Sequence, residues 1–185
     1  NKRKKTNKLY IAASVLIAVL VIASFAFASF SGGGGNSQTG DAAGYVSGIG
    51  IEVDIEGSTH VNEGETVVYS TSPPASGNHW PVPAPCGFYD DPIPDERAVH
   101  NMEHGSVVLW YQPDDSELAG EVNRLVRSLG NGCIVAGSFA DQSFQITATV
   151  WGRALPQSTY EESELRAFIN KYRGKEGPEA GLCRG

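Results

Sequence analysis

Residues 99–111, VHNMEHGSVVLWY, are the stretch that decides the fold. The second half, SVVLWY (106–111), is a short apolar run of the kind that forms a buried β-strand. The first half, VHNMEHG (99–105), holds two of the chain's four histidines, with a methionine and a carboxylate between them. We therefore expect a buried strand that is preceded by a polar segment, whose side chains are of the types that bind metals or take part in catalysis.

The segments that follow this strand predict an α+β domain. Residues 114–129 have apolar side chains at helical spacing, with an aspartate as the N-cap and Gly130 as the stop. Residues 133–136 and 144–151 are typical of strands, and residues 158–172 predict a second helix that opens with a capping-box pattern. This order favours a small, mostly antiparallel sheet with two helices packed on one face.

The N-terminal part of the chain has the pattern of a membrane anchor. Residues 1–8 include five basic side chains and no acid, and residues 9–30, LYIAASVLIAVLVIASFAFASF, carry no charge. About 20 apolar residues span a bilayer core, whereas the apolar part of a signal peptide is about 7–15 residues long. We therefore expect one transmembrane helix over residues 9–30, with residues 1–8 in the cytoplasm. Residues 26–28, Ala-Phe-Ala, leave a cleaved signal peptide as the alternative.

The remaining chain is expected outside the cell membrane. Residues 31–48 are rich in glycine and predict a flexible linker to an extracytoplasmic domain over residues 49–185. Five of the 14 Lys and Arg residues lie on the cytoplasmic side, so nine remain outside against 21 Asp and Glu residues. This acidic excess argues against nucleic acid or anionic lipid as a partner of the outer domain.

The predicted outer domain contains three cysteines, Cys86, Cys133 and Cys183. An oxidising compartment favours one disulfide bond with one thiol left over. Because no Cys-x-x-Cys pair is present, a thioredoxin-type redox motif and a structural zinc ribbon are both disfavoured.

Two conformations of the histidine segment each bring His100 and His104 together. In a helix they lie one turn apart, and His-x-x-Glu-His is then the pattern of the inverted zincins, with Glu103 as general base. In an extended segment Met102 lies on the same face as the two histidines, and thioether sulfur favours Cu(I). We expect the extended or turn conformation, because the strand follows at once and two nearby prolines leave little room for a helix.

Further imidazoles come from His79, in the Pro- and Gly-rich segment 70–87, and from His60, which is the least constrained. An ordered loop of this composition can hold a side chain against a site. We expect a copper site, with zinc as the alternative metal. The expected ligands are His60, His79, His100, Met102 and His104, with Glu103 and Trp80 beside them.

Four stretches resemble, in this order, the bacterial membrane-anchored family catalogued as domain of unknown function 3105. They are YSTSPPASGNHW, CGFYDDPIPDERAVHNMEHGSVVLWY, WGRAL and GPEAGLC, and the resemblance covers residues 58–183. It selects the histidines at 79, 100 and 104 together with Glu103, and position 102 is Leu or Met in the pattern. Cys86 and Cys183 belong to the pattern and Cys133 does not, so the resemblance implies a Cys86–Cys183 disulfide.

Three functions follow as expectations. The first is a membrane-anchored extracytoplasmic metal-binding module that holds copper or delivers it to a metal-receiving membrane enzyme. The second is a non-catalytic accessory subunit of a membrane protein complex, in which the histidines only pack and form hydrogen bonds. The third is a zinc-dependent hydrolase with Glu103 as base. It ranks last because little room is left for its helix and because neither later helix offers an obvious acidic pair to supply the third ligand.

Overall fold

A computed structural model of the chain describes residues 48–183. Within this part of the chain, no helix combines the length and the apolar character needed to cross a membrane. The predicted cytoplasmic tail (1–8), the predicted transmembrane helix (9–30) and nearly all of the predicted linker (31–48) lie outside the described residues.

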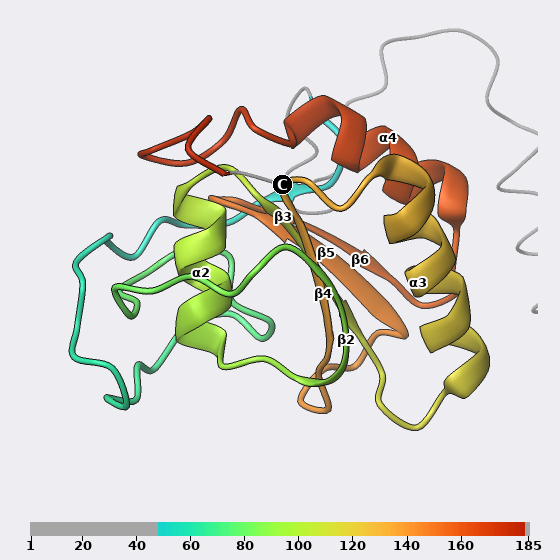
Figure 1. Cartoon of the computed structure of the whole chain (residues 1–185), viewed down its shortest axis with the longest axis horizontal. Coiled ribbons are helices and arrows are strands. Elements are labelled where there is room, and N and C mark those ends of the chain that lie inside the picture. Colours follow the sequence, from blue (N-terminus) through green and yellow to red (C-terminus); the bar gives the residue numbers. More distant parts are fainter. Residues whose placement is uncertain (1–47, 184–185) are drawn as a thin grey trace, which may run out of the picture. The chain divides into compact units, whose positions relative to one another are not determined.

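The domain is built on one six-stranded sheet (Figure 1). Its strands are, in chain order, β1 (Ile51–Glu52), β2 (Gly87–Pro92), β3 (Val107–Tyr111), β4 (Ile134–Ser138), β5 (Ile146–Val150) and β6 (Arg153–Gln157). In space the order is β1-β6-β5-β3-β4-β2. The SVVLWY run forms β3 between β5 and β4, and all five residues of β3 are buried, as the sequence predicts.

The sheet is mixed, because helix α3 (Ser116–Leu129) connects β3 to β4. A crossover helix returns the chain to the starting end of the sheet, so that β4 runs parallel to β3, and β2 is also parallel to β4. The other pairings, β1 with β6, β6 with β5 and β5 with β3, are antiparallel. Asp115 caps α3 by accepting a hydrogen bond from the Leu118 N–H at 2.9 Å, and Gly130 ends it, as predicted.

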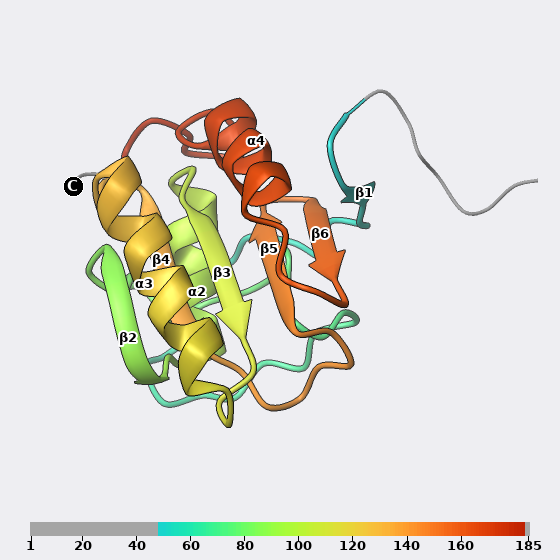
Figure 2. The ribbon, with the colours of Figure 1, turned by 90° about the vertical axis from the view of Figure 1, so that its right-hand side faces the viewer.

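Helix α3 and helix α4 (Glu162–Tyr172) cover one face of the sheet, which confirms the predicted pair of helices (Figure 2). The apolar stripes of both helices pack with the inward side chains of β3, β4 and β5. The predicted capping box does not start α4, since the residue at its N-cap, Glu161, makes no side-chain cap. Instead the Gln157 side chain accepts from the Glu161 N–H at 3.0 Å.

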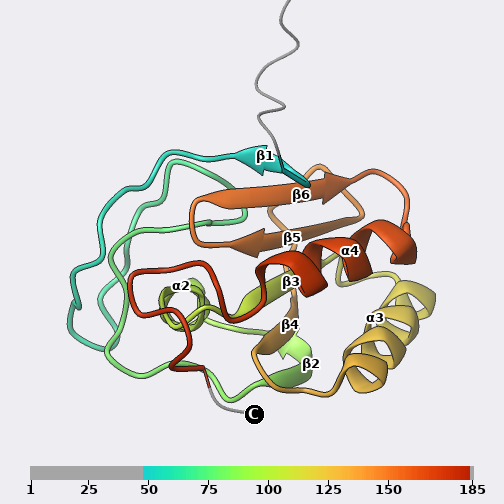
Figure 3. The same ribbon diagram turned by 90° about the horizontal axis from the view of Figure 1, so that it is seen from above.

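The opposite face is covered by helix α2 (Asp95–Glu103), which corrects the expected extended or turn conformation (Figure 3). Pro94 lies at the N-cap. The first N–H groups of a helix have no intrahelical partner, so the N–H that proline lacks costs no hydrogen bond there. Pro94 therefore marks the start of the helix and does not exclude it. Ala98, Val99 and Met102 share one face of the helix and pack into a second apolar cluster under the sheet.

A long segment without named helices or strands, residues 53–86, lies against α2 and is held by partly buried polar contacts. The Glu96 carboxylate accepts a hydrogen bond from the Val67 N–H at 3.0 Å. The Tyr69 hydroxyl donates to the carbonyl of Asn78 at 2.8 Å. Burial raises the pKa of Tyr69, and nearby carboxylates raise it further, so this donor keeps its proton. The contact fixes the loop next to His79.

The C-terminal tail, after α4, crosses the C-terminal end of α2 and pairs with its last carbonyl groups. The N–H of Glu179 donates to the Glu103 carbonyl at 3.0 Å, and the N–H of Cys183 donates to the His104 carbonyl at 3.2 Å. Gly177 has a φ of 123°, and a Cβ atom there would clash with the Glu103 carbonyl. Only glycine permits this close approach of the tail to the helix.

The tail is fastened by a Cys133–Cys183 disulfide, which corrects the expected Cys86–Cys183 bridge. Cys133 immediately precedes β4, and its carbonyl accepts from the Val107 N–H at the start of β3. The tail is hydrogen-bonded to the His104 carbonyl, just before β3. Cys183 therefore lies beside Cys133, and their Cα atoms are 5.3 Å apart. Cys86 has a free thiol.

Candidate metal centre

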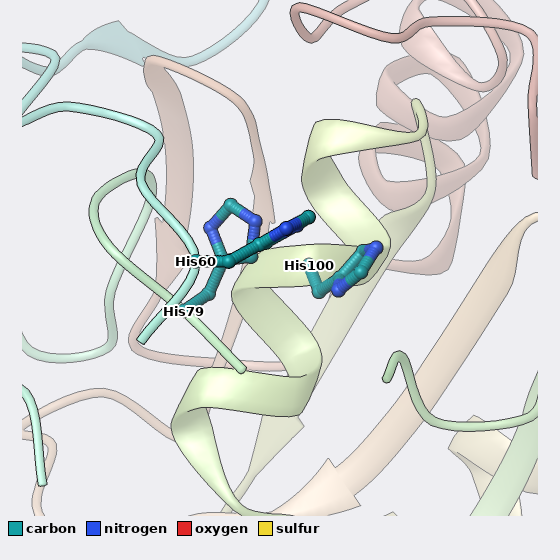
Figure 4. Close-up of side chains that lie close together, drawn as sticks. All are labelled: His60, His79 and His100. Carbon is teal, nitrogen blue, oxygen red and sulfur yellow. The ribbon is translucent and has the colours of Figure 1, made fainter. Parts of the chain in front are cut away.

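All four histidines of the chain gather between the 53–86 segment and helix α2. The ring centroids of His60 and His79 are 4.9 Å apart, those of His60 and His100 are 5.0 Å apart, and those of His79 and His100 are 4.9 Å apart (Figure 4). His104, one turn after His100, lies with its ring centroid 4.5 Å from that of His100. The structure thus brings together every imidazole that the sequence singles out.

The two loop histidines are placed by a short parallel bridge between their backbones. The N–H of Val61 donates to the His79 carbonyl at 2.8 Å, and the N–H of His79 donates to the Thr59 carbonyl at 3.1 Å. The side chain of His79 is fully buried, whereas that of His60 is 51% exposed. The cluster therefore has a buried interior and an edge that reaches solvent at His60.

Backbone carbonyl groups fix the tautomers of the two buried histidines. Nδ1 of His79 lies 2.8 Å from the Gly77 carbonyl oxygen, and Nδ1 of His100 lies 2.6 Å from the Trp80 carbonyl oxygen. A carbonyl oxygen can only accept, so each Nδ1 carries a proton and donates it. In the neutral rings the lone pair is then on Nε2, and the same arrangement orients histidine ligands in metal sites.

Glu103, the last residue of α2, brings a buried carboxylate to this cluster. Its Oε2 atom lies 2.9 Å from Nε2 of His79 and 3.6 Å from Nε2 of His60. Because Nδ1 of His79 already donates to Gly77, the neutral ring presents a lone pair to the carboxylate oxygen. Two such acceptors are stable side by side only when a proton or a metal cation lies with them.

His104 lies on the other side of His100. The Nε2 atoms of His100 and His104 are 3.1 Å apart. Nε2 of His104 also lies 3.3 Å from Oε2 of Glu179, which the C-terminal tail supplies. One side of His100 is thus lined by a second imidazole and an exposed carboxylate.

Burial lowers the pKa of His100 below its ordinary value. The neighbouring His104 and His79 lower the pKa further, while the hydrogen bond to the Trp80 carbonyl and the Glu103 carboxylate act in the opposite direction. The net effect favours the neutral imidazole, which is the form that binds metal ions.

Met102 lies apart from this cluster. It is fully buried, and it packs with Ala98, Val99 and Trp110 in the apolar cluster beneath the sheet. The expected sulfur ligand depended on an extended segment, in which alternate residues share a face. In the helix that forms instead, Met102 points away from His100 and His104.

Two contributors to the site have no clear signal in the sequence. Trp80 lies beside the histidines, as expected, but it orients His100 through its backbone carbonyl, and its indole N–H donates to the Glu65 carbonyl. Glu179 reaches His104 because the tail folds back over α2. Neither the carbonyl direction nor the path of an irregular tail can be deduced from residue types.

The ligand-capable atoms form two overlapping groups. One consists of His60, His79 and His100, and the other of His100, Glu103 and His104. Within each group the ligand atoms lie within 4.8 Å of one another. That spacing suits a transition-metal ion with ligand bonds of about 2 Å.

The fold and the cluster together define an α+β domain whose histidines converge between an irregular loop and a helix. The chain belongs to the family described as "Protein of unknown function (DUF3105)", whose model matches residues 60–185. The matched range begins at the first histidine of the cluster and contains all the residues of both groups. Searches of curated proteins and of solved structures found no significant match.

Proposed function

We propose that this domain binds one transition-metal ion through Nε2 of His60, His79 and His100, with Glu103 as a neighbouring carboxylate. The observation that carries the proposal is the pair of carbonyl contacts at Nδ1 of His79 and His100. These contacts leave Nε2 as the metal-binding nitrogen of both rings, and the two rings belong to a group whose ligand atoms lie within 4.8 Å of one another.

The ligand types favour copper or zinc. Imidazole suits both ions, and the general order of affinities places Cu(II) above Zn(II) for the same nitrogen ligands. A preference for Cu(I) would need the thioether of Met102, which is buried in the apolar cluster. Copper in the divalent state is therefore the ion that we propose, with zinc as the alternative.

The role that we propose is to hold the ion or to deliver it at the outer face of the cell membrane. The basic residues 1–8 and the uncharged run 9–30 support a single membrane anchor, and the glycine-rich residues 31–48 support a flexible tether. The Cys133–Cys183 pairing is in keeping with an oxidising compartment. A membrane enzyme that takes up the metal is the partner that fits this arrangement.

Metal content under competition tests the proposal. The full-length chain, purified in detergent without a histidine tag, is loaded with equal amounts of Cu(II) and Zn(II), and the bound metal is measured by mass spectrometry. We expect one copper ion per chain, with affinity lowered at least tenfold in His60→Ala and unchanged in the matched control Met102→Leu. If neither metal is retained, the proposal is wrong, and a packing role in an accessory subunit takes its place.

A zinc-dependent hydrolase is a second candidate, favoured by the helical conformation of the His-x-x-Glu-His segment. An inverted-zincin site needs a third ligand besides His100 and His104. The later helices offer no obvious one, but His79 lies beside His100 and can supply it. Glu103 already contacts His79 and His60, however, so its carboxylate is placed to orient ligands more than to activate water. Peptide or ester hydrolysis by the zinc-loaded chain that disappears in Glu103→Gln would establish the enzyme.

A further inference from the structure

We propose that the cluster contains a second metal position, formed by His100, Glu103 and His104, through which the ion leaves the first. The first position is the His60, His79 and His100 group. This inference rests on the proposed function, since it concerns the path of an ion that the cluster has bound. It makes the cluster a two-step transfer site instead of a single storage site.

The second position has the geometry of a metal site in its own right. Nε2 of His100 and Nε2 of His104 face one another at 3.1 Å, and a carboxylate oxygen of Glu103 lies within 4.8 Å of both. The Nε2 lone pair of His100 accepts either the Nε2–H proton of a neutral His104 or a metal ion that the two rings share. Glu179, 3.3 Å from His104, adds a carboxylate oxygen at the outer side.

The two positions cannot both be filled, because they share one lone pair. Nδ1 of His100 is committed to the Trp80 carbonyl, so the ring offers only Nε2 to a metal. An ion that moves between the positions keeps His100 as a ligand throughout. It exchanges His60 and His79 on one side for His104 on the other, and no ligand-free state is required.

The two ends of this path differ in their exposure to solvent. His60 reaches solvent directly, with 51% of its side chain exposed, whereas His104 is 21% exposed. His104 lines a cavity of about 350 Å³ that also contacts Cys86, Asn101 and Ser106. The Asn101 amide builds one wall of this cavity by pairing with both the N–H and the carbonyl of Ala84, at 2.9 and 2.8 Å.

The cavity has features of a site that receives a ligand. Ser106 is fully buried, and its hydroxyl has no hydrogen-bond partner among the described residues. Such a group carries an energetic cost that a bound polar group would relieve. Cys86 presents a free thiol to the same space, and the rim includes the exposed apolar side chains of Val82 and Leu182. A chelating group that enters here meets the ion at His104.

The rate of copper release tests the second position separately from binding. Full-length protein in detergent, loaded with one equivalent of Cu(II), is mixed with excess EDTA, and the loss of the copper absorption band is followed. His104→Ala should still bind one copper ion, because it keeps His60, His79 and His100. Its release should be slower by about tenfold, since each 1.36 kcal/mol added to a barrier slows a step tenfold.

His60→Ala is the matched control, because it removes a ligand of the first position only. We expect it to bind copper more weakly and to release it faster. Alkylation of Cys86 with iodoacetamide fills the cavity and should slow copper release as His104→Ala does. The release rate of Cys86→Ser treated with the same reagent should stay that of the untreated protein.

The outcomes separate the two proposals. Copper that binds normally but leaves His104→Ala at the rate of the unmodified protein overturns the second position and leaves the proposed function standing. Two copper ions per chain would also overturn it, because the positions would then not share His100. A chain that binds no copper contradicts both proposals.

Discussion

Glu103 is the side chain that joins the loop histidines to helix α2. Its Oε2 atom contacts Nε2 of both His79 and His60, while its backbone carbonyl accepts from Glu179 in the tail. Whether the carboxylate serves a metal or merely fixes His79 can be decided by an isosteric change. A glutamine keeps the shape and replaces one carboxylate oxygen by an N–H donor.

Glu103→Gln is expected to weaken copper binding about 10–100-fold, the usual effect of losing a partner that orients metal ligands. The free energy of unfolding of the metal-free protein should stay the same or rise, because the new amide N–H can donate to the Nε2 lone pair of His79. Calorimetric titration and urea denaturation measure the two quantities. The opposite pattern, unchanged affinity with a less stable metal-free protein, would mean that the carboxylate pairs with a charged His79.

Asp95 provides a test of pH dependence away from the histidines. Burial raises the pKa of its carboxyl to about 6 from 3.8, with Glu96 and Asp141 adding to the rise. A carboxyl whose pKa is higher in the folded state favours folding while it is protonated. That contribution is fully present below pH 3.8 and is lost as the pH rises through about 6.

Asp95→Asn should therefore stabilise the protein above pH 6. Because the group is partly exposed, the gain in unfolding free energy at pH 7.5 should be about 1 kcal/mol, less than the full shift would imply. Urea denaturation at pH 4 and pH 7.5 gives the comparison, and the gain should be small at pH 4. A variant that is less stable at pH 7.5 would show that the charge assists the start of α2 more than its burial opposes folding.

At the scale of elements, the sequence predicts strongly periodic segments well and short ones poorly. Helix α3 and the end of α4 follow from regular apolar spacing, and β3 follows from an apolar run. Helix α2 has only three apolar positions in nine residues, and its burial under the sheet supplies the stability that its pattern does not show. Strands β1 and β2, which lack a strong apolar pattern, depend on partners distant in sequence.

The candidate site divides in the same way. All four histidines and Glu103 can be selected from the sequence, because few residue types bind metals and here they are few and clustered. The expected sulfur ligand depended on the conformation of one segment, which is helical and places Met102 in the apolar cluster. The carbonyl groups of Gly77 and Trp80 and the carboxylate of Glu179 depend on tertiary contacts, which residue types do not encode.

The disulfide between β4 and the tail should contribute strongly to stability. It closes a separation of 50 residues, for which the loop-entropy model gives about 4 kcal/mol. Cys133→Ser should lower the free energy of unfolding by an amount of that order, whereas Cys86→Ser should change it by less than about 1 kcal/mol. Denaturation of both variants, with mapping of disulfide-linked peptides, makes the comparison. A large loss in Cys86→Ser with little change in Cys133→Ser would return the pairing to Cys86–Cys183.

At the scale of the whole molecule, the sheet separates the larger apolar core from the histidine cluster. Helices α3 and α4 build the larger apolar core on one face, and α2 lies on the other face with the histidine cluster between it and the 53–86 segment (Figure 2). The cluster collects residues from the 53–86 segment, from α2 and from the C-terminal tail. An ion bound there ties together parts of the chain that are far apart in sequence.

Metal binding should therefore stabilise the whole domain. At a free copper concentration of about 100 times the dissociation constant, the free energy of unfolding should rise by about 2.7 kcal/mol, and a chelator should reverse the gain. Thermal unfolding with and without one equivalent of Cu(II) shows the effect. A melting temperature that does not respond to copper would mean that the ion, if bound at all, binds the unfolded chain equally well.

X-ray absorption at the copper edge tests the central claim most directly, because it reports the atoms bound to the ion. The full-length protein, loaded with one equivalent of Cu(II), should show three imidazole nitrogens and oxygen in the first shell, with no sulfur. His79→Asn should lose one imidazole from that shell. A sulfur ligand, or a shell without imidazole scattering, would contradict the account in which His60, His79 and His100 hold the ion.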